Sequence, residues 1–228
     1  MFDTFITKSL RELITEVVEY PLLHFSEKSL QVRLAAKLIQ YPQLSTPIPT
    51  RLYERYKKQI DRLESDKTYL AKALGIPPLQ MEYGTNDKSS HRIDIAILDP
   101  AQIKSIDNWQ FQYNKKYLVP LIAIEIGTEK SGIQNMPRHL LNDAFKVRQS
   151  KKGYILNVIR NTNVCHKSSM SYLNKLDQIK SFKDGLKDAI SQYPNINWIN
   201  LIIHNVMCDF FRKKPGPRSR GGFVGVEY

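Results

Sequence analysis

Apolar residues recur at helical spacing along the first third of the chain. They follow an i, i+3, i+4 pattern over residues 10–18 and again after Ser26, which is placed to cap a helix expected over residues 27–40. Thr50 is a suitable cap for a third helix, whose apolar positions continue toward Leu74. The pattern therefore predicts three helices before any strand.

Prolines and glycines divide the chain into parts. Residues 47–49, with two prolines, are expected to form a linker, and Gly75, which two prolines follow closely, is expected to end the third helix. We therefore predict an N-terminal helical segment over residues 1–75, with a helix that packs on the core. An α/β core over 76–210 and a basic tail over 211–228 follow, and the tail is rich in Pro and Gly and is expected to be flexible.

Beyond residue 78, short apolar runs alternate with helical patterns. Strands are expected over 79–83, 91–98, 118–126, 154–159 and 198–203, and helices over 137–150 and 173–190, the latter with a break near Gly185. The polar and aromatic stretch over 99–117 has no regular pattern. This order predicts an α/β fold with a mixed central sheet flanked by helices.

Two of the expected strands carry an acid among apolar residues. Asp94 lies in the middle of the apolar run at 92–98, and Glu125 lies near the end of the run at 121–126. A buried carboxylate without a partner is so costly that it takes up a proton instead. Two such acids on neighbouring strands favour a shared cation, and oxygen ligands suit Mg²⁺ or Mn²⁺.

Each acid also has an ordinary explanation. Arg92 lies on the same strand face as Asp94, so the two side chains can form a structural ion pair. Glu125 near a strand end can be an exposed rim residue. We favour the metal interpretation because the second strand repeats the arrangement of the first, and because functional groups cluster at strand ends.

The formal net charge of the chain is +12 and its sequence pI is about 9.6. An excess of this size is typical of proteins that bind a polyanion, most often nucleic acid, although a protein that is basic only for solubility has the same composition. Cys165 and Cys208 form no CxxC pattern, which fits a reducing cytoplasm. We expect no membrane partner, because no apolar run approaches the ~18 residues of a membrane span.

The order of elements and the two acids resemble the PD-(D/E)XK nuclease superfamily. In that family an acid on one central strand pairs with an E-x-K unit on the next, an earlier helix adds a Glu, and a Lys sits in the following helix. Asp94 and Glu125 match the acids, Glu27 looks like the helical Glu, and Lys146 looks like the helical Lys. The resemblance implies a restriction-endonuclease-like fold and a metal site at Glu27, Asp94 and Glu125.

Gly127 departs from the family pattern, because it stands where the family has lysine. Three interpretations follow. Lys130 swings back from the turn after the strand, Lys146 reaches in from the helix, or the site binds nucleic acid without cutting it. We favour a relocated lysine, so the expected catalytic set is Asp94, Glu125, Lys130 and Lys146.

The resemblance implies an Mg²⁺- or Mn²⁺-dependent endonuclease that acts on DNA rather than RNA, and double-strand cutting by a protein with one such site favours a homodimer. The alternative is a degenerate nuclease-like module that only binds nucleic acid. His139 is a second candidate base in the expected helix after Glu125. The sequence contains no GxSxG, GxxxxGK[ST] or GxGxxG motif, so serine-hydrolase, P-loop and dinucleotide-binding functions have no support.

Overall fold

The computed structural model describes residues 2–20, 26–60, 75–84, 92–107, 118–128, 136–163, 169–207 and 224–227. These residues form one six-stranded sheet with the order β3-β4-β5-β6-β7-β8. The pairs β3–β4, β4–β5 and β7–β8 are antiparallel, and β5–β6 and β6–β7 are parallel. The strands are β3 (Leu79–Gly84), β4 (Arg92–Ile97), β5 (Ile122–Thr128), β6 (Lys152–Asn163), β7 (Asn197–Met207) and β8 (Val224–Glu227).

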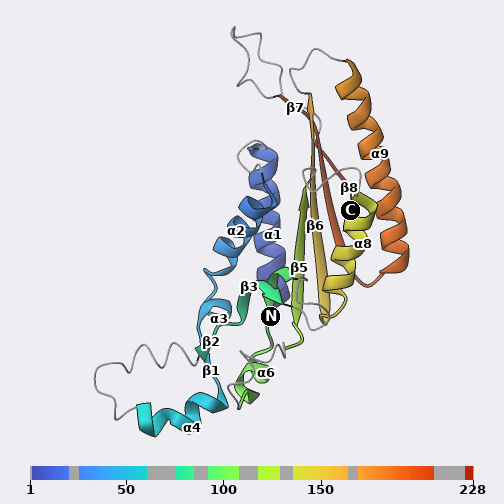
Figure 1. The fold of residues 1–228 in the computed structure, drawn as a ribbon. Helices are drawn as coiled ribbons and strands as arrows, with labels where there is room; N and C mark the ends of the chain where they lie inside the picture. Colours follow the sequence, from blue (N-terminus) through green and yellow to red (C-terminus); the bar gives the residue numbers. More distant parts are fainter. Residues whose placement is uncertain are drawn as a thin grey trace.

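Helices cover both faces of this sheet (Figure 1). On one side lie α1 (Phe2–Glu19) and α2 (Glu27–Leu38), and on the other lie α8 (Met136–Val147) and α9 (Ser169–Gln192). The predicted α/β fold with a mixed, helix-flanked sheet and N-terminal helices is confirmed. Among the described helices, none is long and apolar enough to cross a membrane.

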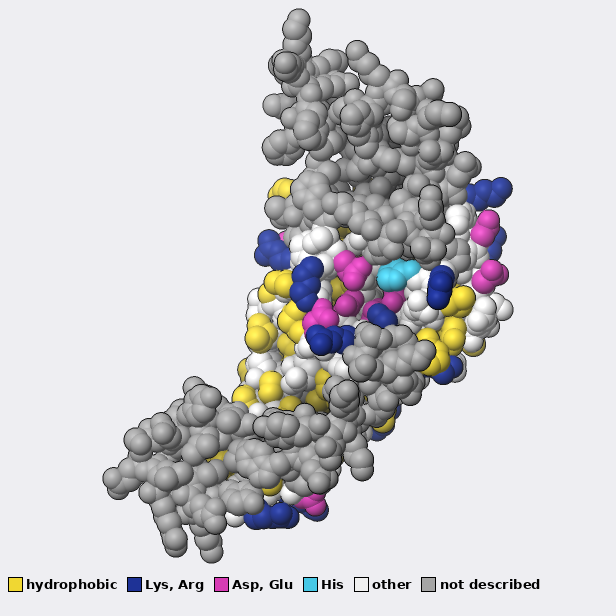
Figure 2. Space-filling view, viewed as in Figure 1, with side chains coloured by type: hydrophobic (Ala, Val, Ile, Leu, Met, Phe, Trp, Pro, Cys, Tyr) yellow, Lys and Arg dark blue, Asp and Glu magenta, His cyan; other side chains and the backbone are white. Residues whose placement is uncertain are grey.

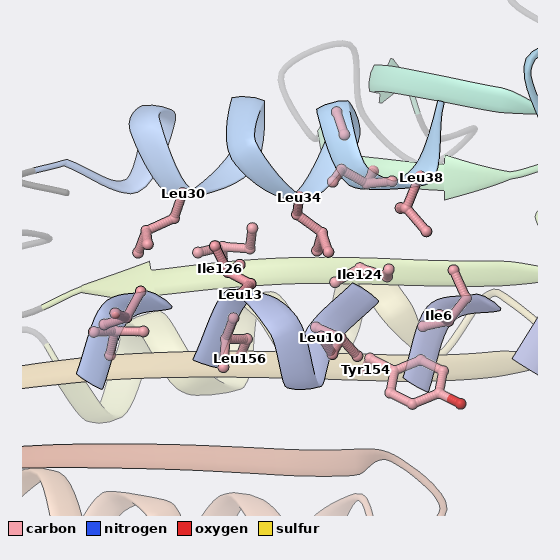
Figure 3. Packing of buried hydrophobic residues seen from close by; sticks show 14 of the residues in the cluster. Ile6, Leu10, Leu13, Leu30, Leu34, Leu38, Ile124, Ile126, Tyr154 and Leu156 are labelled. Carbon is pink, nitrogen blue, oxygen red and sulfur yellow. The ribbon is translucent and has the colours of Figure 1, made fainter. Parts of the chain in front are cut away.

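The α1–α2 side holds the larger apolar core. The Ser26 side chain accepts the backbone N–H of Ser29 at 3.1 Å, so the predicted cap fixes the start of α2. From there Leu30, Leu34 and Leu38 follow at helical spacing, and all three are fully buried. Figure 3 shows these leucines directed at the alternate isoleucines of β5, with α1 packed on the same layer.

Smaller side chains line the sheet under α8. Ala96 of β4 and Ala123 of β5 are fully buried against Ala144 and Val147 of α8. These methyl groups let the helix lie close to the sheet. Alternate strand residues share a face, so Asp94 and Glu125 belong to the same side as the two strand alanines. The fold therefore brings α8 over both predicted acids.

A second sheet has two strands and lies below the main one in Figure 1. In it β1 (Ile48–Pro49) pairs with β2 (Gly75–Ile76), so the expected linker over 47–49 is part of a sheet. Backbone hydrogen bonds between these two distant segments, which the local sequence does not indicate, determine the structure here. The third predicted helix is described only as far as Ile60, and residues 61–74 lie outside the described part, so the helix stop expected at Gly75 stays a prediction. Three short helices complete the described chain: α3 (Pro42–Ser45), α4 (Arg51–Ile60) and α6 (Pro100–Ser105).

Two further expectations are corrected near the C-terminus. Helix α9 passes Gly185 without a break, because Phe182 and Ala189, on either side of it, are buried against the sheet and offset the ~1 kcal/mol cost of a helical glycine. Within the tail that was expected to be flexible, β8 pairs with residues 200–203 of β7. Residues 211–223 lie outside the described part.

Candidate functional site

Asp94 and Glu125 face each other across neighbouring strands. The β4–β5 register pairs Ile95 with Ile124, which places Asp94 opposite Glu125. Both side chains lie on the α8 side of the sheet and are buried, with 8% and 2% of their surface exposed. The two acids that the sequence singled out therefore meet in the fold.

Each carboxylate accepts a backbone N–H from the opposite strand. The N–H of Ile126 donates to Asp94 Oδ2 at 2.8 Å, and the N–H of Asp94 donates to Glu125 Oε1 at 3.2 Å. The backbone pairing of β4 with β5 runs from Ile97 and Ile122 to Ile95 and Ile124. Side-chain bonds thus continue the pairing where the ladder stops, and they hold the two carboxylates side by side.

The carbonyl of Asp94 accepts a hydrogen bond from a side chain of α2. Gln31 Nε2 donates to this oxygen at 2.7 Å and to Glu82 Oε1 at 3.0 Å. Glu82 lies on β3 between Met81 and Tyr83, the partners of Ile95 and Ile93, and has a φ of 50°. It also accepts a 2.6 Å bond from Lys28. Three side chains therefore fix the backbone that carries Asp94.

Helix α8 presents three polar side chains to the acids. His139, Asp143 and Lys146 lie on one face of this helix at i, i+4 and i+7. Lys146 Nζ lies 2.6 Å from Glu125 Oε2 and 3.1 Å from Asp143 Oδ1. His139 Nε2 lies 3.2 Å from Asp143 Oδ2. In Figure 2 a histidine lies beside a group of acidic side chains near the middle of the viewed face of the molecule.

Burial makes the acids hard to ionise. It raises the pKa of Asp94 to about 7, with the Glu27 and Asp143 charges adding to the shift and the Ile126 N–H opposing it. Burial, then the charges of Asp94 and Asp143, raise the pKa of Glu125 well above its usual range. For Lys146 burial acts to lower the pKa, but the carboxylates outweigh it and the pKa rises. The cluster is therefore short of positive charge.

The space in front of Gly127 is taken by another polar side chain. A Cβ at this position would lie 2.8 Å from Asn157 Oδ1 and 3.7 Å from His139 Nε2. Asn157 Nδ2 in turn donates to Asn200 Oδ1 at 2.9 Å, and both asparagines are buried. The position where the resemblance places a lysine is thus closed by Asn157.

We expect Gly127→Ala to lower the free energy of unfolding by about 1–3 kcal/mol, because the added methyl group overlaps Asn157 Oδ1. Urea unfolding measures this cost. In an Asn157→Ala background the same substitution should cost little, since the overlapping atom is gone. An equal cost in both backgrounds contradicts the steric explanation.

The structure brings three of the predicted site residues together, namely Asp94, Glu125 and Lys146. Glu27 lies near enough for its charge to act on Asp94. However, the described residues contain no group of three or more His, Cys, Asp or Glu side chains placed to hold a metal ion, so the three-acid ligand set stays a prediction. Lys130 lies outside the described part of the chain.

Arg92 does not form the structural ion pair with Asp94 that the sequence allows. Its side chain is exposed, and its charge acts on Glu82, whose pKa is lowered first by the hydrogen bonds from Lys28 and Gln31 and also by Arg92. Asp94 instead has the Ile126 N–H and the α8 residues around it. The strand-face argument for a structural Arg92–Asp94 pair is therefore wrong.

Sequence reasoning missed three buried polar residues of this site: Asp143, Asn157 and Asn200. Asn157 and Asn200 each interrupt an apolar strand, which is the same signal that revealed Asp94. Asp143 lies one helical turn from both His139 and Lys146, and its burial was not evident from that spacing.

The two carboxylates fit a divalent cation in donor chemistry and charge. They supply hard oxygen atoms side by side, and the raised pKa values of both acids show that added positive charge would stabilise their ionised forms. Comparison with known proteins adds no relative: no family model matches the chain, and neither curated proteins nor solved structures give a match.

Proposed function

We propose that this chain is a metal-dependent nuclease that hydrolyses phosphodiester bonds in DNA. One observation carries the proposal: two buried carboxylates, Asp94 and Glu125, lie side by side, with the ammonium of Lys146 2.6 Å from one of them. The one ammonium of Lys146 is shared with Asp143, so two acids this costly to ionise need a further cation or a proton.

The roles follow from the position and charge of each group. A divalent ion at the carboxylates would lower the pKa of a water molecule and neutralise charge on a phosphate. Asp94 and Glu125 supply its oxygen ligands, and their bonds to the backbone N–H groups of Ile126 and Asp94 hold them in orientation. Gln31 fixes the backbone of Asp94 from behind.

Lys146 acts as a cation rather than as a base. Although burial opposes the charged form, the charges of Glu125 and Asp143 raise the pKa of this lysine, so it stays protonated. A protonated amine donates hydrogen bonds and stabilises the negative charge that develops on the phosphate, but it takes no proton from water. This supports the interpretation in which Lys146 replaces the lysine missing at Gly127.

The basic composition supports nucleic acid as the substrate. A chain with a formal charge of +12 attracts a polyanion, and binding should weaken steeply as salt rises because counterions are released. We place DNA ahead of RNA on the resemblance alone. A homodimer would supply two sites for the two strands.

The test is cleavage of a supercoiled plasmid in the presence of Mg²⁺. We expect the parent protein to nick or linearise it, and Asp94→Asn and Glu125→Gln to lower the rate by at least about 100-fold, because each removes a charged ligand. Glu12→Gln on the exposed side of α1 is the matched control and should cut like the parent. If both site variants also cut at the parent rate, the proposal is wrong.

A second candidate is a nuclease-like module that binds nucleic acid without hydrolysis. It is favoured by Gly127, whose usual lysine is absent, and by the ion pair that already neutralises Glu125. It predicts salt-sensitive DNA binding by the parent protein and no product with Mg²⁺ or Mn²⁺. Failure to bind DNA at low ionic strength would instead favour an acidic protein partner.

A further inference from the structure

The polar atoms between α8 and the sheet are not all satisfied. His139 Nε2 and both carboxylate oxygens of Asp143 are buried, yet none of the three makes a hydrogen bond within the described part of the chain. The contacts of Asp143 with His139 and Lys146 have ion-pair distances without the direction of a hydrogen bond. Lys146 compensates Oδ1 of Asp143 by its charge, which leaves His139 Nε2 and Asp143 Oδ2 as the buried atoms for which native proteins usually supply a partner.

The spacing of these atoms suits a metal ion. His139 Nε2 and Asp143 Oδ2 are 3.2 Å apart, one helical turn from each other on α8. Two ligands that each lie about 2.1 Å from one ion, at a right angle, are separated by about 3 Å. A shared ion would therefore satisfy both atoms with little movement of either side chain.

A third donor points to the same region from the sheet. The point where a Gly127 Cβ would lie is 2.8 Å from Asn157 Oδ1 and 3.7 Å from His139 Nε2, so both atoms border Gly127, which has no side chain to separate them. The bond from Asn157 Nδ2 to Asn200 Oδ1 turns the amide so that its oxygen faces Gly127. An outer hydrogen bond that orients a ligand in this way is usual at metal sites.

The charge balance also favours a cation here. The cluster of Asp94, Glu125, Asp143 and Lys146 has three carboxyl groups and one ammonium. Lys146 is directed to Oδ1 of Asp143 and to Glu125, which leaves Oδ2 of Asp143 on the His139 side. A divalent ion on that side would compensate Asp143 without displacing the lysine.

We propose that His139, Asp143 and Asn157 form a second cation site, separate from the Asp94–Glu125 pair, for a divalent first-row transition metal. Its ligands are His139 Nε2, Asp143 Oδ2 and Asn157 Oδ1, with water completing the coordination. An imidazole beside two oxygen donors selects Mn²⁺, Co²⁺ or Zn²⁺ over Mg²⁺ and Ca²⁺. This site does not depend on the proposed nuclease activity.

The test uses Co²⁺ added to the full chain. We expect calorimetric binding together with a strongly shifted, exchangeable imidazole N–H signal in the proton NMR spectrum, which reports a histidine ligand. The Asp94–Glu125 pair has no imidazole, so the signal distinguishes the two sites even if no plasmid is cut. His139→Gln should abolish the signal and weaken this binding step by at least about 100-fold, and Asn200→Ala should weaken it by about 10-fold.

Arg138→Gln, at the exposed neighbour of His139, is the matched control and should keep the signal. Circular dichroism shows whether each variant folds, and Asp143→Asn replaces His139→Gln if the latter does not. The proposal is overturned if the parent gives no shifted imidazole signal, or if the signal persists in both folded site variants. It is also overturned if Mg²⁺ at equal concentration displaces Co²⁺ from the imidazole.

Discussion

Lys146→Met is expected to reduce plasmid cleavage by at least about 100-fold and to lower the free energy of unfolding by about 3–5 kcal/mol at pH 8. The lysine is the ion-pair partner of Glu125 at 2.6 Å, and Glu125 is almost completely buried. Methionine keeps most of the apolar stem but leaves a buried carboxylate without a cation. The cost is therefore electrostatic rather than a loss of packing.

The stability loss should depend on pH in a defined direction. The folded-state pKa of Glu125 is already above its unfolded value, and loss of the ammonium raises it further. An acid with a raised folded pKa keeps its proton in the folded state at low pH, and stability falls as pH rises through the range between the two values. The variant should therefore lose much less stability at pH 5 than at pH 8, as urea unfolding at the two pH values will measure.

Two variants separate this explanation from a general loss of structure. Lys151→Met, at a lysine whose side chain is 61% exposed, should change stability by less than about 0.5 kcal/mol. Adding Glu125→Gln to Lys146→Met should restore most of the stability but none of the activity, because the unpaired charge is gone and a ligand with it. A double variant as unstable as the single one would show that the ion pair is not the cause.

The sequence was sufficient to locate the two acids because burial in an apolar strand is a strong local signal. Asp94 and Glu125 lie in runs rich in isoleucine, where a buried carboxylate is costly. The register that sets them opposite each other on one face cannot be inferred from either strand alone. It depends on how β4 and β5 pair after the intervening stretch over 99–117, whose sequence has no regular pattern. The sequence therefore predicts that the two acids meet, but only the folded structure tests that prediction.

Contacts between elements that are distant in the sequence could not be predicted from local sequence patterns. The hydrogen bond from Gln31 to the carbonyl of Asp94 connects residues 63 positions apart. From the sequence alone, Gln31 is equally well explained as an exposed residue on the surface of its helix. The pairing of Pro49 with Gly75 likewise places in a sheet a segment that the sequence reads as a linker. By contrast, the Ser26 cap is a bond to a residue three positions on, and local chemistry predicted it.

Asp94→Asn is expected to stabilise the metal-free protein at pH 8 by about 1–4 kcal/mol while removing activity. Burial raises the pKa of Asp94 to about 7, so this acid is ionised at pH 8 in a place that disfavours its charge. Asparagine is uncharged, and its oxygen can still accept the Ile126 N–H that Asp94 Oδ2 accepts at 2.8 Å. An acid that destabilises the metal-free protein is expected at a ligand site, because a bound ion stabilises the folded state and offsets that cost.

The sign of the pH dependence follows from the direction of the shift. The folded pKa of Asp94 exceeds its ordinary value of 3.8, so the parent should lose stability as pH rises from about 4 to about 7, and Asp94→Asn should lose less over that range. The two proteins should therefore differ little in stability at pH 4 and most at pH 8 in EDTA, as thermal unfolding will measure. Mg²⁺ should then raise the melting temperature of the parent at pH 8 and leave the variant unchanged. A variant that is less stable than the parent at pH 8 without metal would mean that Asp94 is kept for structure, and the case for a ligand at this position would fail.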